Sequence, residues 1–141
     1  MSHHAETITD FDAIIFDMDG LLLDTEKLSY QSFITTAAAY DQTFQFDDYR
    51  QLIGRNAKTG IDILRHMLPA SIDAAKFKND WLEVYRQLLD QQIEVKPGAH
   101  HLLACLAKMQ VPRAVATSSS GIKARAILDR VGLWQYISHL T

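Results

Sequence analysis

Two aspartates separated by one residue form the segment whose residue types and spacing point most directly to chemistry. Asp17 and Asp19 follow the apolar run 13–16, and Gly20 comes directly after them. A short apolar run rich in β-branched residues predicts a strand buried on both faces, and Gly20 permits the sharp turn that must follow it. Because side chains alternate along an extended chain, we expect the two carboxylates to point to the same side.

Two acids on one side of a strand's carboxyl end can bring together a divalent cation, a nucleophile and a proton carrier. Open α/β sheets bind their ligands at that end. An acidic turn that only solubilises the strand end is the alternative. A calcium loop of the EF-hand type is excluded, because its sixth and twelfth positions require Gly and Glu, whereas counting from Asp17 they hold Leu22 and Leu28.

A second polar segment follows another predicted strand. Residues 113–117 are predicted to form a strand that ends in Thr117, and three serines, Ser118 to Ser120, lead into a predicted helix over 121–131. The Thr117 hydroxyl and the free N–H groups at the helix start can bind a phosphoryl oxygen. For this segment alone, N-capping of the helix by serine is the alternative interpretation.

Both segments match motifs of a known family. The run Asp-Met-Asp-Gly-Leu-Leu-Leu-Asp-Thr at 17–25 closely resembles the first motif of the haloacid dehalogenase-like (HAD) phosphohydrolases. The run Ala-Val-Ala-Thr-Ser-Ser at 114–119 resembles the second motif, in which a Thr or Ser at the strand end holds the transferring phosphoryl group. The resemblance implies a Rossmann-like parallel sheet and a phosphatase that acts on small phosphorylated metabolites.

The resemblance also implies roles for individual residues. Asp17 would attack phosphorus to give an aspartyl-phosphate, and Asp19 would protonate the leaving oxygen and later activate water. Thr117, Ser118 and Gly20 would bind the phosphoryl group. Mg²⁺ would be held at Asp17 and Asp19, the latter through its backbone carbonyl, since this ion suits carboxylate, carbonyl and water ligands.

The sequence between the two motifs is helical in pattern from Glu26 to about Gln92, with no convincing strand, so we interpret it as an insertion into an α/β domain. It resembles the helical C1 cap of the β-phosphoglucomutase-like subfamily. The predicted domains are therefore a partial α/β core over 1–25 and 94–141, and a cap over 26–93. Helices are expected at 26–40, 47–52, 57–67, from a Ser71 cap onward, and at 99–109.

Two features of the predicted cap bear on substrate choice. The segment 54–58 resembles the family's specificity loop, and in it Arg55, Asn56 or Lys58 could contact a sugar hydroxyl or a distal anion. Solvated residues at a helix start are an equal alternative for these three. The helically spaced residues Phe77, Trp81, Val84 and Leu88 are interpreted as core.

Composition bounds the function classes. The 141 residues carry a net charge of -3, which argues against a general nucleic-acid binder, and 48% are hydrophobic, as in a globular protein. No apolar run approaches the roughly 20 residues that span a bilayer, and the N-terminus lacks the features of a signal peptide, so we expect a cytoplasmic protein without membrane contact. Cys105 is the single cysteine and is expected to be a packed core thiol.

A third strand is expected to begin near Ile137. The family continues beyond its third strand to supply a lysine and at least one more metal-binding acid, whereas this sequence ends at Thr141. We therefore expect a C-terminally truncated phosphatase that is inactive alone. We also expect an open sheet edge at 13–16, which would favour a homodimer or strand exchange. A phosphomutase, a non-catalytic module that binds a phosphorylated ligand or a partner protein, and a helical interaction domain with an incidental aspartate pair are the competing functions.

Overall fold

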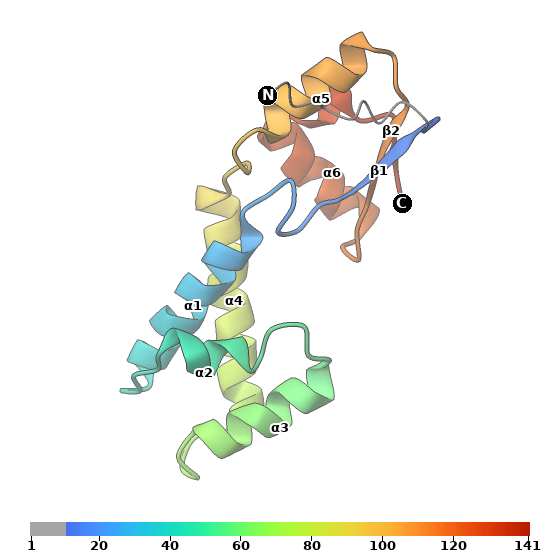
Figure 1. Cartoon of the computed structure of the whole chain (residues 1–141). Coiled ribbons are helices and arrows are strands. Elements are labelled where there is room, and N and C mark those ends of the chain that lie inside the picture. Colours follow the sequence, from blue (N-terminus) through green and yellow to red (C-terminus); the bar gives the residue numbers. More distant parts are fainter. Residues whose placement is uncertain (1–10) are drawn as a thin grey trace, which may run out of the picture. The chain divides into compact units, whose positions relative to one another are not determined.

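The computed structural model describes residues 11–141, so the first ten residues of the predicted 1–25 segment lie outside it. The chain divides into two compact units. One is Asp24–Ile93, which we call the helical unit. The other combines the described residues up to Leu23 with Glu94–Thr141, and we call it the sheet unit (Figure 1).

The sheet unit contains a three-stranded parallel sheet, which confirms the predicted α/β class. Its strands are β1 (Ile14–Asp17), β2 (Arg113–Ala116) and β3 (His139–Leu140), in the order β1-β2-β3. Neighbouring parallel strands require crossover connections, and helices α5 (Ala99–Lys108) and α6 (Gly121–Arg130) supply them. A short 3₁₀ turn, η1 (Trp134–Tyr136), precedes β3.

Strand β1 is buried on one face only, so the predicted burial of both faces is wrong. Phe16 is 8% exposed, but its neighbour Ile15 is 68% exposed. The reason is visible in Figure 1, where α5 and α6 lie to the same side of β1 and β2. The N–H of Ile14 donates to the carbonyl of Pro112, so by alternation the polar backbone groups of Ile15 point away from β2. Self-association through this edge stays a prediction.

Helix α5 also corrects the expectation for the single cysteine. Cys105 is half-buried, with its Sγ 3.6 Å from Nε2 of His101 one turn earlier on the helix. Leu103 and Leu106 occupy the buried stripe of α5 instead. Cys105 lies at the side of that stripe, so it is not the packed core thiol that the apolar neighbourhood predicts.

The helical unit consists of α1 (Thr25–Ala39), α2 (Phe46–Arg50), α3 (Ala57–Met67) and α4 (Ala74–Gln92). The limits of α3 are those expected from the sequence. The expected Ser71 cap is wrong, since α4 begins after Asp73, whose Oδ1 accepts a hydrogen bond of 2.9 Å from the N–H of Lys76. Among the described residues, no helix is long and apolar enough to cross a membrane.

Aromatic side chains fill the core of the helical unit. Phe33 on α1 and Phe77 on α4 are fully buried, and their ring centroids lie 6.0 Å apart in an edge-on arrangement. Trp81, one turn further along α4, lies 5.2 Å from Phe33. Edge-on pairs of this kind add to the free energy of area burial. These ring contacts hold α1 and α4 side by side and fix the side chains that pack between the two helices (Figure 1).

Candidate active site

The two aspartates of the first motif lie at the carboxyl end of β1. Asp17 is the last residue of the strand and Asp19 follows two residues later, and both are exposed. Met18 between them is 1% exposed. The alternation of the extended chain therefore continues past the end of the strand, with Met18 anchored in the core and a carboxylate on either side of it in contact with solvent.

A tight turn holds this segment in place. The carbonyl of Met18 accepts hydrogen bonds of 3.1 Å from the N–H groups of Leu22 and Leu23, and the N–H of Gly20 donates to the carbonyl of Leu23 at 2.9 Å. Gly20 has a φ of +76°, a conformation that favours glycine. Leu22 and Leu23 are buried, so the turn that follows the aspartates is fixed by the core.

Thr117 joins this site from the neighbouring strand. The register pairs Asp17 with Ala116, so Thr117 comes immediately after the residue opposite Asp17. Its Oγ1 lies 3.5 Å from Oδ2 of Asp19, and it accepts a hydrogen bond of 3.2 Å from the N–H of Ser119. The structure thus brings Asp17, Asp19 and Thr117 together at the carboxyl ends of β1 and β2, which we call the carboxyl edge of the sheet, as their positions at the ends of parallel strands predict.

No serine side chain of the described residues caps the start of α6, although such capping is the alternative interpretation of this segment. Ser120 is the N-cap residue, but its side chain makes no capping hydrogen bond. Ser118 is exposed in the loop between Thr117 and the helix. Ser120 therefore does not cap the N–H groups of the first turn of α6, which come directly after the loop that contains Thr117.

The donor atoms at this edge fit part of a magnesium site. Among residues 11–141, no group of three or more His, Cys, Asp and Glu side chains is close enough to hold a metal. Two carboxylates and a backbone carbonyl remain, and magnesium is commonly bound by one or two carboxylates, waters and substrate phosphate. Asp17 keeps one oxygen, Oδ1, in a 2.9 Å hydrogen bond from the N–H of Met18.

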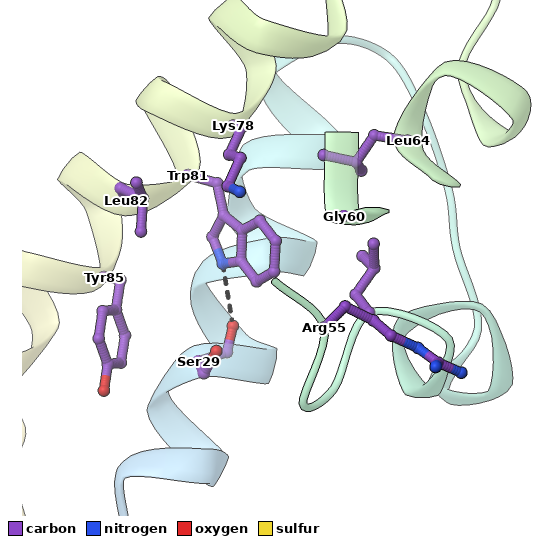
Figure 2. A pocket seen from close by; sticks show the side chains of 9 residues that line it. Ser29, Arg55, Gly60, Leu64, Lys78, Trp81, Leu82 and Tyr85 are labelled. Atoms are coloured by element: carbon purple, nitrogen blue, oxygen red, sulfur yellow. Dashed lines mark hydrogen bonds between the residues drawn. The ribbon is translucent and has the colours of Figure 1, made fainter. Parts of the chain in front are cut away.

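The helical unit contains a hollow of about 220 Å³ (Figure 2). We call it the Trp81 hollow. Its lining is mainly apolar, from Leu52 and Leu64 near α2 and α3 and from Trp81, Leu82 and Tyr85 on α4. A second hollow of about 230 Å³ shares four of its residues and extends to Thr25 and Glu26 at the start of α1. Ser29, Leu52, Trp81 and Tyr85 line both.

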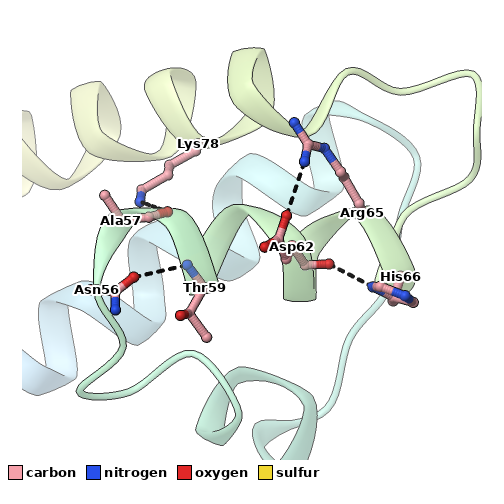
Figure 3. Close-up of polar contacts among 7 residues, drawn as sticks. All are labelled: Asn56, Ala57, Thr59, Asp62, Arg65, His66 and Lys78. Atoms are coloured by element: carbon pink, nitrogen blue, oxygen red, sulfur yellow. Dashed lines mark hydrogen bonds and ion pairs between the residues drawn. The ribbon is translucent and has the colours of Figure 1, made fainter.

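Of the three predicted specificity residues, only Arg55 lines these hollows. Its Nε donates to the carbonyl of Gln51 at 3.2 Å, and the guanidinium extends away from Trp81 (Figure 2). Asn56 caps α3, because its Oδ1 accepts a hydrogen bond of 2.9 Å from the N–H of Thr59 (Figure 3). Lys58 is exposed on α3 and lines neither hollow.

Sequence reasoning missed Trp81 and Lys78 as lining residues. The spacing along α4 indicates a core position for Trp81, and the ring does pack in the core, but it also lines both hollows. Lys78 extends over the start of α3 and donates to the carbonyl of Ala57 at 3.1 Å (Figure 3). Lys78 also lies next to Gly60, since its Nζ would be 3.7 Å from a Cβ added there, an ordinary van der Waals contact. No signal in the linear sequence marks this contact.

One titratable group in this region is perturbed. Burial raises the pKa of Tyr49, against an opposing effect from its side-chain hydrogen bond with Ser29. The phenol therefore stays protonated and neutral well above neutral pH, and the Tyr49 side of the second hollow carries no charge.

Comparison with known proteins agrees with these motifs. Residues 14–141 match the family model for haloacid dehalogenase-like hydrolases. The chain is 29% identical over 125 residues to the phosphorylated carbohydrates phosphatase of Thermotoga maritima, covering 89% of this chain and 58% of that protein. It is 29% identical over 131 residues to the phosphoglycolate phosphatase of Agrobacterium fabrum, covering 90% and 56%.

A solved structure shows the same relation. A variant of CbbY from Rhodobacter sphaeroides, crystallised with xylulose-1,5-bisphosphate, has a TM-score of 0.63 and 28% sequence identity, covering 92% of this chain and 62% of that one. The chain thus spans a little over half the length of these relatives. Because the family match covers nearly all of the described residues, the chain belongs to the haloacid dehalogenase-like hydrolase family.

Proposed function

We propose that this chain carries the nucleophile and phosphate-binding part of a phosphomonoester hydrolase that works through an aspartyl-phosphate. The observation that carries the proposal is the meeting of the two motifs. Thr117 lies beside Asp19, 98 positions away in the sequence, at the sheet edge where Asp17 ends β1. Parallel α/β sheets place their reactive groups at this edge.

The proposed reaction uses the exposed carboxylates in sequence. Oδ1 of Asp17 is engaged by the N–H of Met18, so Oδ2 is the oxygen that attacks phosphorus. A bond forms between Oδ2 and phosphorus while the bond from phosphorus to the leaving oxygen breaks, and Asp19 gives that oxygen a proton. Asp19, now deprotonated, takes a proton from water; the water oxygen bonds to phosphorus while the bond from phosphorus to Oδ2 of Asp17 breaks, which restores the Asp17 carboxylate and releases inorganic phosphate.

The remaining residues bind and orient the phosphoryl group. The Thr117 hydroxyl and the N–H of Ser118 are the proposed donors to its oxygens. The N–H of Gly20 is bonded to the Leu23 carbonyl, so the proposed contribution of Gly20 is the turn that brings the backbone close to the phosphoryl group. When bound, Mg²⁺ would be held by the Asp17 carboxylate and the Asp19 backbone carbonyl and would offset the negative charge of the phosphoryl group.

We infer that the substrate is a small phosphorylated metabolite. The names of two relatives, a phosphorylated carbohydrates phosphatase and a phosphoglycolate phosphatase, support this class. The helical unit, with its two hollows, is the proposed cap that selects the leaving group. Among the predicted specificity residues, Arg55 is the one whose position supports that role.

The test is hydrolysis of p-nitrophenyl phosphate with and without Mg²⁺ by the chain and two variants. Asp17→Asn removes the nucleophile and should lower the rate by at least about 10³-fold, as loss of a nucleophile does in other hydrolases. Asp12→Asn, which changes an exposed acid outside the site, is the matched control and should keep the rate. Hydrolysis by the chain at a measurable rate that Asp17→Asn leaves unchanged would contradict the proposal.

A binding measurement tests the proposal if the chain hydrolyses p-nitrophenyl phosphate too slowly to measure. Orthovanadate and tungstate are phosphate analogues, and calorimetry should detect their binding to the chain. Thr117→Val should weaken that binding, because the variant keeps the shape of threonine but has no hydroxyl. The absence of both hydrolysis and analogue binding would overturn the assignment.

A further inference from the structure

The Trp81 hollow has the properties of a site for a flat ring. We propose that it binds a planar aromatic ring of the leaving group, such as a nucleobase or a phenol, and that Trp81 is the residue that selects it. The proposal rests on the proposed function in one respect only, namely that the ring belongs to the substrate of the phosphatase.

The orientation of Trp81 is fixed by polar contacts on α1. Its Nε1–H donates to Oγ of Ser32 at 2.8 Å and to the carbonyl of Ser29 at 3.2 Å. Ser32 is fully buried, and its hydroxyl donates to the same Ser29 carbonyl at 2.7 Å. A serine hydroxyl that is buried and paired in this way holds the indole in one orientation, so the ring forms a rigid wall.

Neighbouring rings support the same wall. The rings of Phe33 and Tyr49 lie at 65° and 72° to the plane of the indole, with centroid distances of 5.2 and 6.1 Å. Figure 2 shows the indole lying among the side chains of Leu82, Leu64 and Arg55, with the Arg55 guanidinium turned away. A rigid aromatic wall binds another ring at little entropic cost, because no side chain has to be ordered on binding.

The lining of the hollow is mainly apolar. Of its polar side chains, Lys78 donates to the Ala57 carbonyl, and the Arg55 guanidinium, which donates through Nε to the Gln51 carbonyl, extends away from Trp81. The Ser29 carbonyl accepts from both Trp81 and Ser32. A sugar or glycerol chain needs hydrogen-bond partners for several hydroxyls, whereas a flat ring gains its free energy from stacking and from removal of apolar surface from water.

The size of the hollow agrees with one ring. Its volume of about 220 Å³ is below the roughly 300–1,000 Å³ of sites that enclose drug-sized ligands. The chain has two tryptophans, and Trp134 is the other one, located in η1 of the sheet unit. Replacement of Trp134 therefore leaves Trp81 as the only tryptophan that reports on a bound ring.

The experiment titrates Trp134→Phe with uridine, phenol, glycerol and glucose, and follows tryptophan emission and calorimetric heat. Uridine and phenol should change the emission of Trp81 and bind more tightly than glycerol and glucose. In a Trp81→Leu variant the uridine affinity should fall about 5- to 150-fold, the range for loss of one base-stacking side chain. Trp81→Phe keeps a flat ring in the core and should lose less affinity than Trp81→Leu.

Several results would overturn the proposal. They are equal affinity for glucose and uridine, unchanged Trp81 emission at saturating uridine, or equal uridine affinity with and without the Trp81 ring. The emission measurement does not depend on a Trp81 variant, so a variant that fails to fold leaves the proposal open to refutation.

The same proteins separate this proposal from the proposed function. Asp17→Asn should bind uridine as tightly as the chain does while losing hydrolysis. Hydrolysis that depends on Asp17, without ring binding, would remove only the Trp81 proposal. Ring binding without hydrolysis or phosphate-analogue binding would remove the phosphatase assignment and leave the hollow as a binding site.

Discussion

The hydrogen bond between Ser32 and Trp81 offers a direct test of how the helical unit is held together. We consider the variants Ser32→Ala and Trp81→Phe, alone and combined. Ser32→Ala removes the acceptor 2.8 Å from the indole N–H, and Trp81→Phe removes the donor while keeping an aromatic ring in the core. The double-mutant cycle isolates the energy of the pair from the other effects of each change.

The expected coupling follows from the partners in the structure. A neutral intramolecular hydrogen bond contributes about 0.5–1.5 kcal/mol, and an orphaned buried donor costs about 1–3 kcal/mol. In Ser32→Ala the indole N–H keeps the Ser29 carbonyl at 3.2 Å, so it is not orphaned. We therefore expect a coupling of about 1 kcal/mol rather than the full penalty.

The single variant alone would give a misleading value. Alanine has a higher helix propensity than serine by roughly 0.5 kcal/mol, and Ser32 lies inside α1, so part of the loss is offset. Propensity contributes equally to both arms of the cycle and cancels. Urea unfolding of the four proteins, followed by circular dichroism because tryptophan emission differs among them, gives the four free energies.

The refuting result is a coupling below the scatter of independent sites. Distant substitutions add to within about 0.3–0.5 kcal/mol, so a smaller coupling would mean that Ser32 does not hold the indole in solution. Thr36→Val is the control for loss of a buried hydroxyl on the same helix. The Thr36 hydroxyl donates only to the Ser32 carbonyl in its own helix, so this change should show no coupling to Trp81→Phe.

Two further predictions concern the sheet unit. Gly98→Ala should lower the free energy of unfolding by about 1–2 kcal/mol because the φ of Gly98 is +85°, whereas Gly121→Ala, in helical backbone, should raise it by about 0.4–1 kcal/mol. Nothing lies within 4 Å of a Cβ added at either position, so the two variants differ in backbone conformation and not in packing. Urea unfolding midpoints that shift in the same direction for both variants would contradict this expectation. The chain should self-associate through the open edge of β1. Ile15→Lys, at a position that is 68% exposed, should abolish this self-association. A monodisperse wild-type monomer in light scattering at high concentration would contradict the prediction.

Much of the sheet unit follows from local sequence pattern. Short apolar runs that end in polar residues predict β1 and β2, and parallel pairing then places Asp17 and Thr117 at one edge without further information. The exposure of Ile15 does not follow, because an apolar run has the same pattern whether one or both faces are covered. Only the placement of α5 and α6 on one side decides it.

In the helical unit, choices between equivalent residues limit sequence reasoning. Ser71 and Asp73 are both good capping residues, and a turn closed by the N–H of Ile72 and the carbonyl of Pro69 delays the start of α4 until Asp73. Trp81 occupies a spacing typical of core residues, and the hollow beside it depends on how α1, α3 and α4 pack. Lys78 and Gly60 meet for the same reason, across 18 positions of sequence.

The insertion of the helical unit into the sheet unit has a consequence for the order of folding. Asp17 and Ala116 pair across 99 positions, so a ribosome must release most of the chain before β1 finds β2. The helices of the inserted segment make contacts over shorter separations and can form first.

The bridge between Leu23 and Val95, with the N–H of Lys96 bonded to the Leu22 carbonyl at 2.8 Å, joins the two ends of that segment. Once it closes, the chain that separates β1 from β2 is shortened by about 70 residues. The entropic cost of pairing the strands then falls by about 1 kcal/mol, roughly a fivefold gain in the probability of encounter. The inserted segment would in this way act as a folding aid for the strands that flank it.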